Sequence, residues 1–345
     1  MRSKVLVIVG PTSSGKSDLA VRLAKRLNGE IISADSRQAY RGLDIGSGKI
    51  TKKDMHGVRH HLLDVADPKR RFTAERYRVL ARRAIIEIQK RGKLPIICGG
   101  TGFYIDAVFN DSPFPAIEPD PALRKKLSKK SPPQLLAMLK RLDFNRWKTI
   151  DGNDSDNKNA RRLIRAIEIA EGSRRQAEKP RSNSNDRERQ ANAMRPVETT
   201  EAETTSQKYA MPLPTRNYDA KFIGIKIPFD ELRDRIRKRL LKRVRSGMIA
   251  EVRSLHEPRN AADPNGGLSW KRLDELGLEY RYVARYLQGK MTKQEMIDKL
   301  TIEIGRYAKR QMTWWKRNNA IEWLDLAACQ RLSEACQKAS DMIGF

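Results

Sequence analysis

The fold is decided by a stretch near the N-terminus, Val5-Leu6-Val7-Ile8-Val9-Gly10-Pro11-Thr12-Ser13-Ser14-Gly15-Lys16-Ser17. Its first five residues are all apolar, as in a strand that is buried on both faces of a parallel sheet. A helix is predicted to follow from Lys16 to about Leu27, where Asn28-Gly29 stops it. Between the two, residues 10–17 match the phosphate-binding pattern G-x-x-x-x-G-K-[ST].

The flanking strand and helix are the context that this pattern requires, and they disfavour a chance match in a surface loop. Backbone N–H groups and the positive end of the helix dipole converge on a phosphate, Lys16 adds a charge, and the Ser17 hydroxyl can bind Mg²⁺. The residues predicted to hold a diphosphate or triphosphate are Gly10, Pro11, Thr12, Ser13, Ser14, Gly15, Lys16 and Ser17. The loop alone identifies neither the phosphate compound nor the reaction.

Strand and helix signals alternate through the first hundred residues. Strands are predicted at 31–34 and 94–98, with a helix from Thr73 to Lys90 between them. A returning strand is predicted at Phe222–Ile225, and the chain beyond it is predicted to be helical to its end. This alternation predicts an α/β fold with a P-loop NTPase-like parallel sheet core. No predicted strand shows the apolar run followed by an acid that is typical of a motor NTPase, and Leu62-Leu63-Asp64 is only a weak substitute. This favours a transferase or a small kinase.

Polar residues follow two of the predicted strands. Asp35 closes the strand at 31–34, and Gly99-Gly100-Thr101-Gly102 follows the strand at 94–98. Ligands of open parallel sheets bind beyond the carboxyl ends of the strands, so both segments should face the phosphate loop. A carboxylate there could bind Mg²⁺ or act as a general base. Asp35 could instead cap a helix or a turn, and the glycine run could be only a tight turn.

Composition divides the rest of the chain. Residues 116–172 are basic and helical in pattern, and a predicted helix from Arg161 to Glu171 turns its arginines outward. Residues 173–217 are polar, with Tyr209 as the only aromatic, so they are predicted to be disordered. The predicted domains are a core of residues 1–115 and 218–345 with C-terminal helices, a helical insertion at 116–172, and a low-complexity insert at 173–217.

The net charge of +28 favours a polyanionic partner, either nucleic acid or an acidic membrane surface, although a generally basic proteome is an alternative. The three cysteines form no disulfide framework or metal-binding pair, which fits a reducing compartment. The apolar run at 5–9 is too short for a signal sequence or a membrane span. We therefore expect a soluble, cytoplasmic protein that does not bind a membrane.

Two helical segments concentrate the positive charge. In the predicted helix from Glu231 to Ser246, Arg235, Arg239 and Arg243 form a stripe beside the apolar one. Near the end, residues 306–317 interleave aromatic side chains with lysine and arginine. Aromatic rings stack on bases and cations bind phosphates, so this segment suits loop or single-stranded RNA. A solvated helix that packs its aromatic residues into the core is the alternative.

Seven ordered blocks of the sequence resemble the bacterial tRNA dimethylallyltransferases, over nearly the whole chain apart from about 173–217. They are Gly-Pro-Thr-x-Ser-Gly-Lys-Ser at 10–17, Asp35-Ser36-x-Gln38-x-Tyr40, Asp44-Ile45-Gly46, His60-His61-Leu62, Gly99-Gly100-Thr101-Gly102-x-Tyr104, Arg162-Leu163-Ile164-Arg165-Ala166 and Tyr307-Ala308-Lys309-Arg310-Gln311-x-Thr313-Trp314. Members of this family transfer a dimethylallyl group from its diphosphate to the adenosine 3′ of the anticodon in tRNA.

The resemblance implies specific roles. Residues 12–17 would hold dimethylallyl diphosphate with Mg²⁺ on Ser17, Asp35 would be the general base, and Thr101 and Lys16 would act at the reacting centre. Arg239 would bind the diphosphate. The residues implied to contact the anticodon stem-loop are Asp35, Ser36, Arg37, Gln38, Thr101, Arg124, Arg161, Arg162, Arg165, Lys309, Arg310 and Gln311. We expect a monomer.

Three other functions fit parts of the pattern. An adenylate isopentenyltransferase uses the same donor with free AMP or ADP, but it has no use for the basic insertion and tail. A P-loop small-molecule kinase would use Asp35 to activate a hydroxyl group. A non-catalytic RNA-binding module would keep the phosphate loop for structure alone.

Overall fold

The computed structural model describes residues 3–110, 117–152, 157–178, 218–257, 267–326, 328–329 and 332–343. The chain divides into two compact units, one made of residues 1–111 and 211–345 and the other of residues 112–210. Across the described residues, no helix combines the length and apolarity that crossing a bilayer requires.

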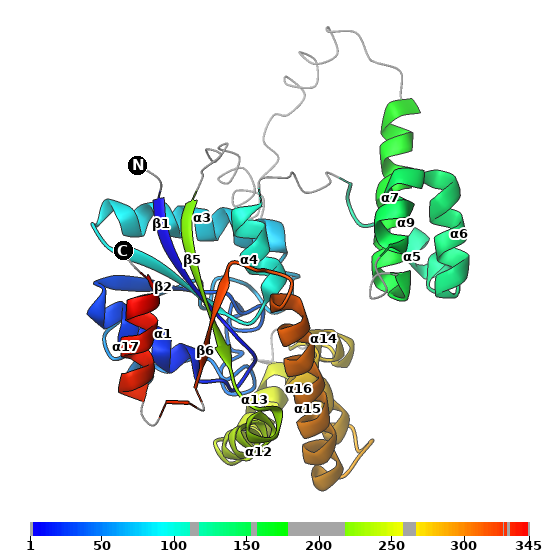
Figure 1. Ribbon diagram of the computed structural model, residues 1–345. Helices are drawn as coiled ribbons and strands as arrows, with labels where there is room; N and C mark the ends of the chain where they lie inside the picture. The colour runs from blue at the N-terminus through cyan, green and yellow to red at the C-terminus, as the bar shows by residue number, and fades with distance from the viewer. Residues whose placement is uncertain are drawn as a thin grey trace, which may run out of the picture. The chain divides into compact units, whose positions relative to one another are not determined.

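The first unit is built on a six-stranded sheet in which every neighbouring pair is parallel, so the predicted α/β parallel-sheet fold is confirmed (Figure 1). The strand order is β3-β2-β4-β1-β5-β6. The strands are β1 (Ser3–Val9), β2 (Gly29–Ser33), β3 (His60–His61), β4 (Leu94–Gly99), β5 (Tyr218–Lys226) and β6 (Ile321–Asp325).

The apolar run at Val5–Val9 forms the centre of this sheet. β1 lies between β4 and β5, and all five of these side chains are fully buried. Leu6 and Ile8 pack with α1 (Lys16–Arg26) and α17 (Leu332–Ile343) in one apolar cluster. The helix α3 (Ala74–Lys90) packs on β2 and β4, and its residues are absent from that cluster. Helices thus cover both faces, as a continuous apolar strand requires.

The prediction that the chain is helical from Phe222–Ile225 to its end is wrong, because β6 is a strand. Its sequence, Ile321-Glu322-Trp323-Leu324-Asp325, pairs in parallel with β5. Ile321 and Leu324 are buried while Glu322 and Asp325 are exposed, as suits a short strand at the edge of the sheet. A strand of only five residues, shortly after a 23-residue helix, is too short to give a clear periodic signal in the sequence.

The remaining helices of the first unit include five that follow β5. These five are α12 (Phe229–Arg245), α13 (Met248–His256), α14 (Trp270–Leu276), α15 (Leu278–Leu287) and α16 (Lys293–Trp315). The short helices α2 (Lys52–Met55) and α4 (Gly102–Phe109) belong to the first half of the same unit.

The second unit is helical in its described part. Its helices are α5 (Pro121–Leu127), α6 (Pro132–Leu142), α7 (Phe144–Asp151) and α9 (Ala160–Glu178). The core contains Leu127, Leu135, Leu139, Leu163 and Ile167, all fully buried. The predicted helix end at Glu171 is wrong, since α9 continues to Glu178 and includes the first residues of the predicted disordered insert. Residues 179–217 of that insert lie outside the described residues.

Two glycines offer a paired test of the packing. A Cβ atom added at Gly99 would collide with the Ala34 carbonyl group across the β2–β4 pair, whereas one added to Gly305 in α16 would find its nearest neighbour 3.8 Å away. We expect Gly99→Ala to lower the free energy of unfolding by about 1–3 kcal/mol. Gly305→Ala should raise it by up to about 1 kcal/mol, because alanine favours the helix.

Denaturant unfolding of the two variants against the parent chain measures both effects. Equal stability of the Gly99→Ala chain and the parent would contradict the close approach of β4 to β2.

Candidate functional site

The phosphate loop joins β1 to α1, as its sequence predicts. Gly10 and Gly15 both have positive φ angles, of +152° and +88°, which only glycine adopts without strain. Gly15 is the N-cap residue of α1 and uses no side chain for capping, so the N–H groups of the first turn point toward the loop. Ser14 is fully buried, and its hydroxyl has no hydrogen-bond partner among the described residues. An orphaned hydroxyl inside this loop fits an anion ligand.

The Lys16 ammonium group lies inside this loop. It donates a hydrogen bond of 3.1 Å to the Pro11 carbonyl oxygen. Burial lowers the pKa of Lys16 below its ordinary value, and the nearby Asp35 carboxylate opposes that shift. A desolvated cation gains more from an incoming phosphate than a solvated one does. Ser17, the second residue of α1, is exposed.

The ends of β2 and β4 are tied together beside this loop. The Thr101 N–H donates to the Ala34 carbonyl oxygen at 3.1 Å, and the Ser36 N–H donates to the Thr101 hydroxyl oxygen at 3.1 Å. The Asp35 carboxylate accepts from the Arg37 N–H at 2.8 Å and from the Gln38 N–H at 3.4 Å. Asp35 therefore stabilises its own turn, as expected of an aspartate that caps a turn. It also interacts electrostatically with Lys16.

Gln311 is expected to contact tRNA, but in the structure its side chain is buried. It is 6% exposed on α16, and its Oε1 accepts from the Thr12 N–H at 2.8 Å. Its Nε2 donates to the Gly100 carbonyl oxygen at 2.8 Å. Both ends of the amide are thus used within the protein, and Gln311 fixes the phosphate loop to the glycine turn after β4.

The neighbours of Gln311 on α16 divide between the site and the surface. Burial raises the pKa of Tyr307 to about 12, and its side chain is hydrogen-bonded to Thr101. Lys309 and Arg310 are exposed. The Lys309 ammonium lies 4.1 Å from the centre of the Phe229 ring, and the Arg310 guanidinium lies 5.9 Å from that of Tyr307. Both cations remain accessible to a polyanion.

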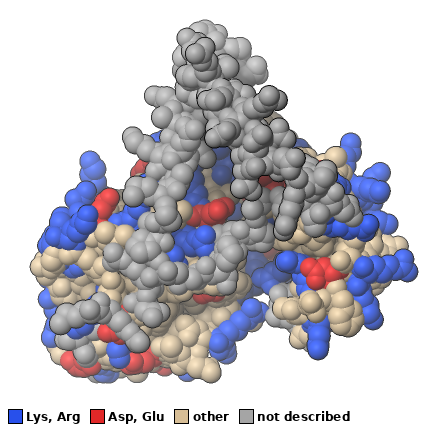
Figure 2. All heavy atoms as spheres, turned by 90° about the horizontal axis from the view of Figure 1, so that it is seen from above, with Lys and Arg blue, Asp and Glu red and all other residues tan. Residues whose placement is uncertain are grey.

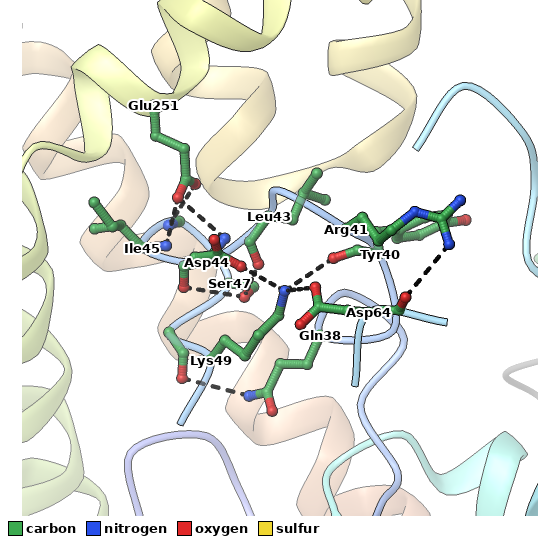
Figure 3. A network of polar contacts seen from close by, with 12 residues as sticks. Gln38, Tyr40, Arg41, Leu43, Asp44, Ile45, Ser47, Lys49, Asp64 and Glu251 are labelled. Atoms are coloured by element: carbon green, nitrogen blue, oxygen red, sulfur yellow. Dashed lines mark hydrogen bonds and ion pairs between the residues drawn. The ribbon is translucent and has the colours of Figure 1, made fainter. Parts of the chain in front are cut away.

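Residues 43–49, here called the 43–49 loop, are held by polar groups from distant parts of the chain (Figure 3). The Glu251 carboxylate of α13 accepts from the N–H groups of Asp44, Ile45 and Gly46 at 3.0, 2.6 and 3.0 Å. Figure 3 shows the Lys49 ammonium between the carboxylates of Asp44 and Asp64, and it forms an ion pair with each. None of these contacts is local in sequence except that of Lys49 with Asp44.

The arginine stripe of α12 faces the same loop. Arg239 donates to the Gly48 carbonyl oxygen at 3.0 Å, and burial lowers its pKa. Arg243 donates to the Gly46 carbonyl oxygen at 2.7 Å and pairs with Glu279 at 2.8 Å. Gln38 donates to the same Gly48 oxygen at 3.4 Å. The 43–49 loop therefore sets the positions of Gln38 and Arg239 together. Lys16, Asp35 and Arg239 also interact electrostatically with one another.

The arginines of the second unit have two kinds of environment. Arg124 and Arg165 both bind the buried Glu168 carboxylate, each through a contact of 2.7 Å. The prediction that Arg165 turns outward is therefore wrong, since its side chain also donates to the Ile117 carbonyl oxygen at 2.8 Å. Arg161 is exposed and Arg162 is half-buried. Each paired arginine side chain is still about a third exposed.

Lysine and arginine are spread widely over the described surface in the view of Figure 2, with smaller areas of acidic side chains. A cavity of about 700 Å³ lies beside α16 and is lined by Ile227, Phe229, Met312 and Trp323 among others. At 100° per residue, Met312 and Lys309 lie on the side of α16 opposite Tyr307 and Trp314. This cavity is therefore separate from the groups gathered around Thr101.

The chain matches known proteins over most of its length. The family model described as IPP transferase matches residues 38–318. A tRNA dimethylallyltransferase 2 of Trichlorobacter lovleyi is 38% identical over 93% of this chain and 92% of its own. A tRNA dimethylallyltransferase 2 of Treponema denticola is 39% identical, with 90% and 91% covered.

Solved structures agree with these matches. The tRNA isopentenylpyrophosphate transferase of Bacillus halodurans is 30% identical, with a TM-score of 0.64 and coverage of 99% of this chain and 97% of that one. The region that the family model matches includes the 43–49 loop, Thr101 and α16. The chain therefore belongs to the IPP transferase family, and it is an enzyme that transfers prenyl groups.

Proposed function

We propose that this chain transfers the dimethylallyl group of dimethylallyl diphosphate to the exocyclic amine of the adenosine 3′ of the anticodon in tRNA and releases diphosphate. The observation that carries the proposal is the convergence of the phosphate loop, Asp35 and Thr101 at one edge of the sheet. A phosphate site, a carboxylate and a hydroxyl group at this edge fit an allylic diphosphate that meets an amine. The curated relatives that act on tRNA support the same reaction.

The phosphate loop would hold the leaving group. Its amides, the Ser14 hydroxyl, the Lys16 ammonium and the Arg239 guanidinium would stabilise the charge that develops on the diphosphate as the allylic C–O bond breaks. Residues 12–17 are the proposed contacts. Because burial lowers the pKa of Lys16, the charge of the diphosphate would also favour its protonated form.

Mg²⁺ is the proposed metal, with Ser17 as its ligand. Among the described residues there is no group of three or more His, Cys, Asp or Glu side chains that could hold a metal by itself. This donor set fits Mg²⁺, which usually binds through one or two protein groups together with substrate phosphates and water. The ion would neutralise charge on the leaving diphosphate.

Asp35 would accept a proton from the exocyclic amine while the amine nitrogen forms the bond to the allylic carbon. The adenine would leave its stack to reach this edge, and Ser36, Arg37, Gln38 and Thr101 would contact it there. Arg124, Arg161, Arg162, Arg165, Lys309 and Arg310 are the proposed contacts to the RNA backbone. Gln311 is withdrawn from that group, because its amide is buried between Thr12 and Gly100. A monomer in the cytoplasm stays our prediction.

One incubation tests the proposal against its alternatives. The protein, Mg²⁺ and dimethylallyl diphosphate are combined with tRNA, with an anticodon stem-loop, or with AMP, and the nucleosides are analysed by mass spectrometry. Dimethylallyl adenosine from both RNA substrates supports the proposal. Modification of AMP alone would show an adenylate isopentenyltransferase, and phosphate transfer from labelled ATP to a nucleoside would show a kinase.

Lys16→Ala tests the phosphate loop. The change removes the ammonium charge that faces the diphosphate, so we expect transfer to be abolished in a chain with an unchanged thermal unfolding midpoint. Single-turnover transfer with saturating stem-loop measures the effect. A rate within about tenfold of the parent, or roughly 1.4 kcal/mol, would contradict this role.

Asp35→Asn separates the catalytic from the structural role. Asparagine keeps the turn, because its side-chain oxygen can still accept from the Arg37 N–H, but it is a far weaker base. We expect a single-turnover rate lower by about 10²–10⁴, with stem-loop affinity changed less than threefold. Near-normal transfer would leave Asp35 as a turn residue only. Recovery at high Mg²⁺ would make it a metal ligand.

Glu251→Gln tests whether the 43–49 loop positions Gln38 and Arg239. The change removes the charge that holds three loop amides, and hydrogen bonds to a charged group contribute about 1.5–3 kcal/mol. We expect KM for the donor to rise roughly tenfold or more. Glu231→Gln is the control, because it breaks an ion pair with Arg235 on the surface of α12 and should change KM less than twofold. Equal effects of the two changes would reject the positioning role.

A further inference from the structure

An aromatic pair lies beside Thr101 and has no role in the site as described. Phe103, in the first turn of α4, is 54% exposed, although large apolar side chains are usually buried. Its ring meets that of Trp314 from α16 edge to face, with 6.5 Å between centroids and 81° between planes. The two residues are 211 positions apart in the sequence, so the fold brings them together.

Trp314 is fixed in its orientation. Its indole Nε1 donates to the Asp106 carboxylate at 3.0 Å, one turn further along α4. Gly102 lets the indole lie directly against the start of α4, since a Cβ atom at this position would collide with the ring. A ring held by a hydrogen bond and by backbone contact loses little conformational entropy when a ligand stacks on it.

The pair lies among cations. The Arg317 guanidinium is 5.5 Å from the centre of the Trp314 ring, and Arg310, one turn before Trp314 on α16, is exposed. Aromatic faces next to arginine and lysine are the usual means of binding unpaired nucleotides, whose bases stack while their phosphates pair with the cations. The charge next to the pair favours RNA over an apolar peptide.

The pair also lies close to the proposed acceptor site. Thr101 is the N-cap residue of α4, so Phe103 follows the proposed contact to the adenine by two residues. On α16, Tyr307 is hydrogen-bonded to Thr101, and Trp314 comes seven residues later, about 10 Å along the helix. RNA that delivers a base to Thr101 would pass this pair with its adjoining nucleotides.

We propose that Phe103 and Trp314 form a stacking platform for an unpaired base of the RNA, next to the adenosine that receives the dimethylallyl group. This inference rests on the proposed function, because it takes its ligand from the same tRNA loop. Stacking depends on the ring and not on base identity, so the platform positions the loop and reads little sequence.

Variants at Phe103 test the platform by binding alone. The dissociation constant of an anticodon stem-loop is measured for Phe103→Ala, Phe103→Leu and Phe103→Tyr, without the donor. We expect the alanine and leucine variants to bind about 5- to 150-fold more weakly, since stacking contributes about 1–3 kcal/mol per base. The tyrosine variant keeps a ring and should stay within threefold of the parent.

Two further measurements separate stacking from other causes. The slope of log affinity against log salt should be unchanged in Phe103→Ala, because the phosphate contacts remain. A 2-aminopurine placed on either side of the target adenosine should change its fluorescence on binding the parent chain but not the alanine variant. Ile302→Ala is the matched control, since Ile302 is 55% exposed on α16 and should leave affinity unchanged.

Three results would overturn the platform. They are parental affinity of Phe103→Ala, recovery by leucine equal to that by tyrosine, and an equal loss in Ile302→Ala. The second would indicate a simple apolar contact, as a protein partner would make. The test is independent of the reaction. Platform-dependent binding without any transfer would refute the proposed function alone, and transfer with binding that ignores Phe103 would refute the platform alone.

Discussion

The close approach of β4 to β2 is the constraint on which the site depends. Gly99 lies against the backbone of Ala34, and the hydrogen bonds of Thr101 with Ala34 and Ser36 continue this contact beyond the strands. With no room for a side chain between them, the two strands end side by side and deliver Asp35 and Thr101 to one place. Wider spacing would separate the carboxylate from the hydroxyl group before any substrate bound.

A second layer of contacts fixes this edge from the C-terminal half of the chain. Gln311 joins α16 to the phosphate loop and to Gly100 with one amide group. Glu251 and Arg243 do the same for the 43–49 loop from α13 and α12. Helices that are distant in sequence thus hold the binding groups in place before a substrate arrives. Substrate binding therefore does not have to order them.

Much of this arrangement could be predicted from the sequence, because its signals are local. The apolar run before Gly10 fixed a buried strand, and the spacing of Gly10, Gly15 and Lys16 fixed the loop and the start of α1. The carboxyl ends of parallel strands share an edge, so Asp35 and Thr101 could be placed near each other without coordinates. The resemblance of the seven blocks identified the family.

The remainder depends on contacts between distant residues, which leave no local pattern. Nothing around Gln311 distinguishes an amide that bridges two loops from one that faces solvent, and nothing around Glu251 indicates three backbone partners. The short strand β6 was missed for a related reason, since it exists because β5 offers an edge to pair with. Arg165 looked solvent-facing by helical periodicity, yet a buried carboxylate three residues later on α9 binds it.

The order of strands in the sheet has a consequence during synthesis. β1 pairs with β4 on one side and with β5 on the other, but about 120 residues, including the second unit, separate Gly99 from Tyr218. At ribosomal rates of about 5–20 residues per second, the most apolar strand of the protein waits roughly 6–24 s with one edge open. Such an edge can recruit strands of other chains. The nascent polypeptide therefore passes through an aggregation-prone stage that ends when β5 pairs with β1. The length of the insertion sets how long this stage lasts.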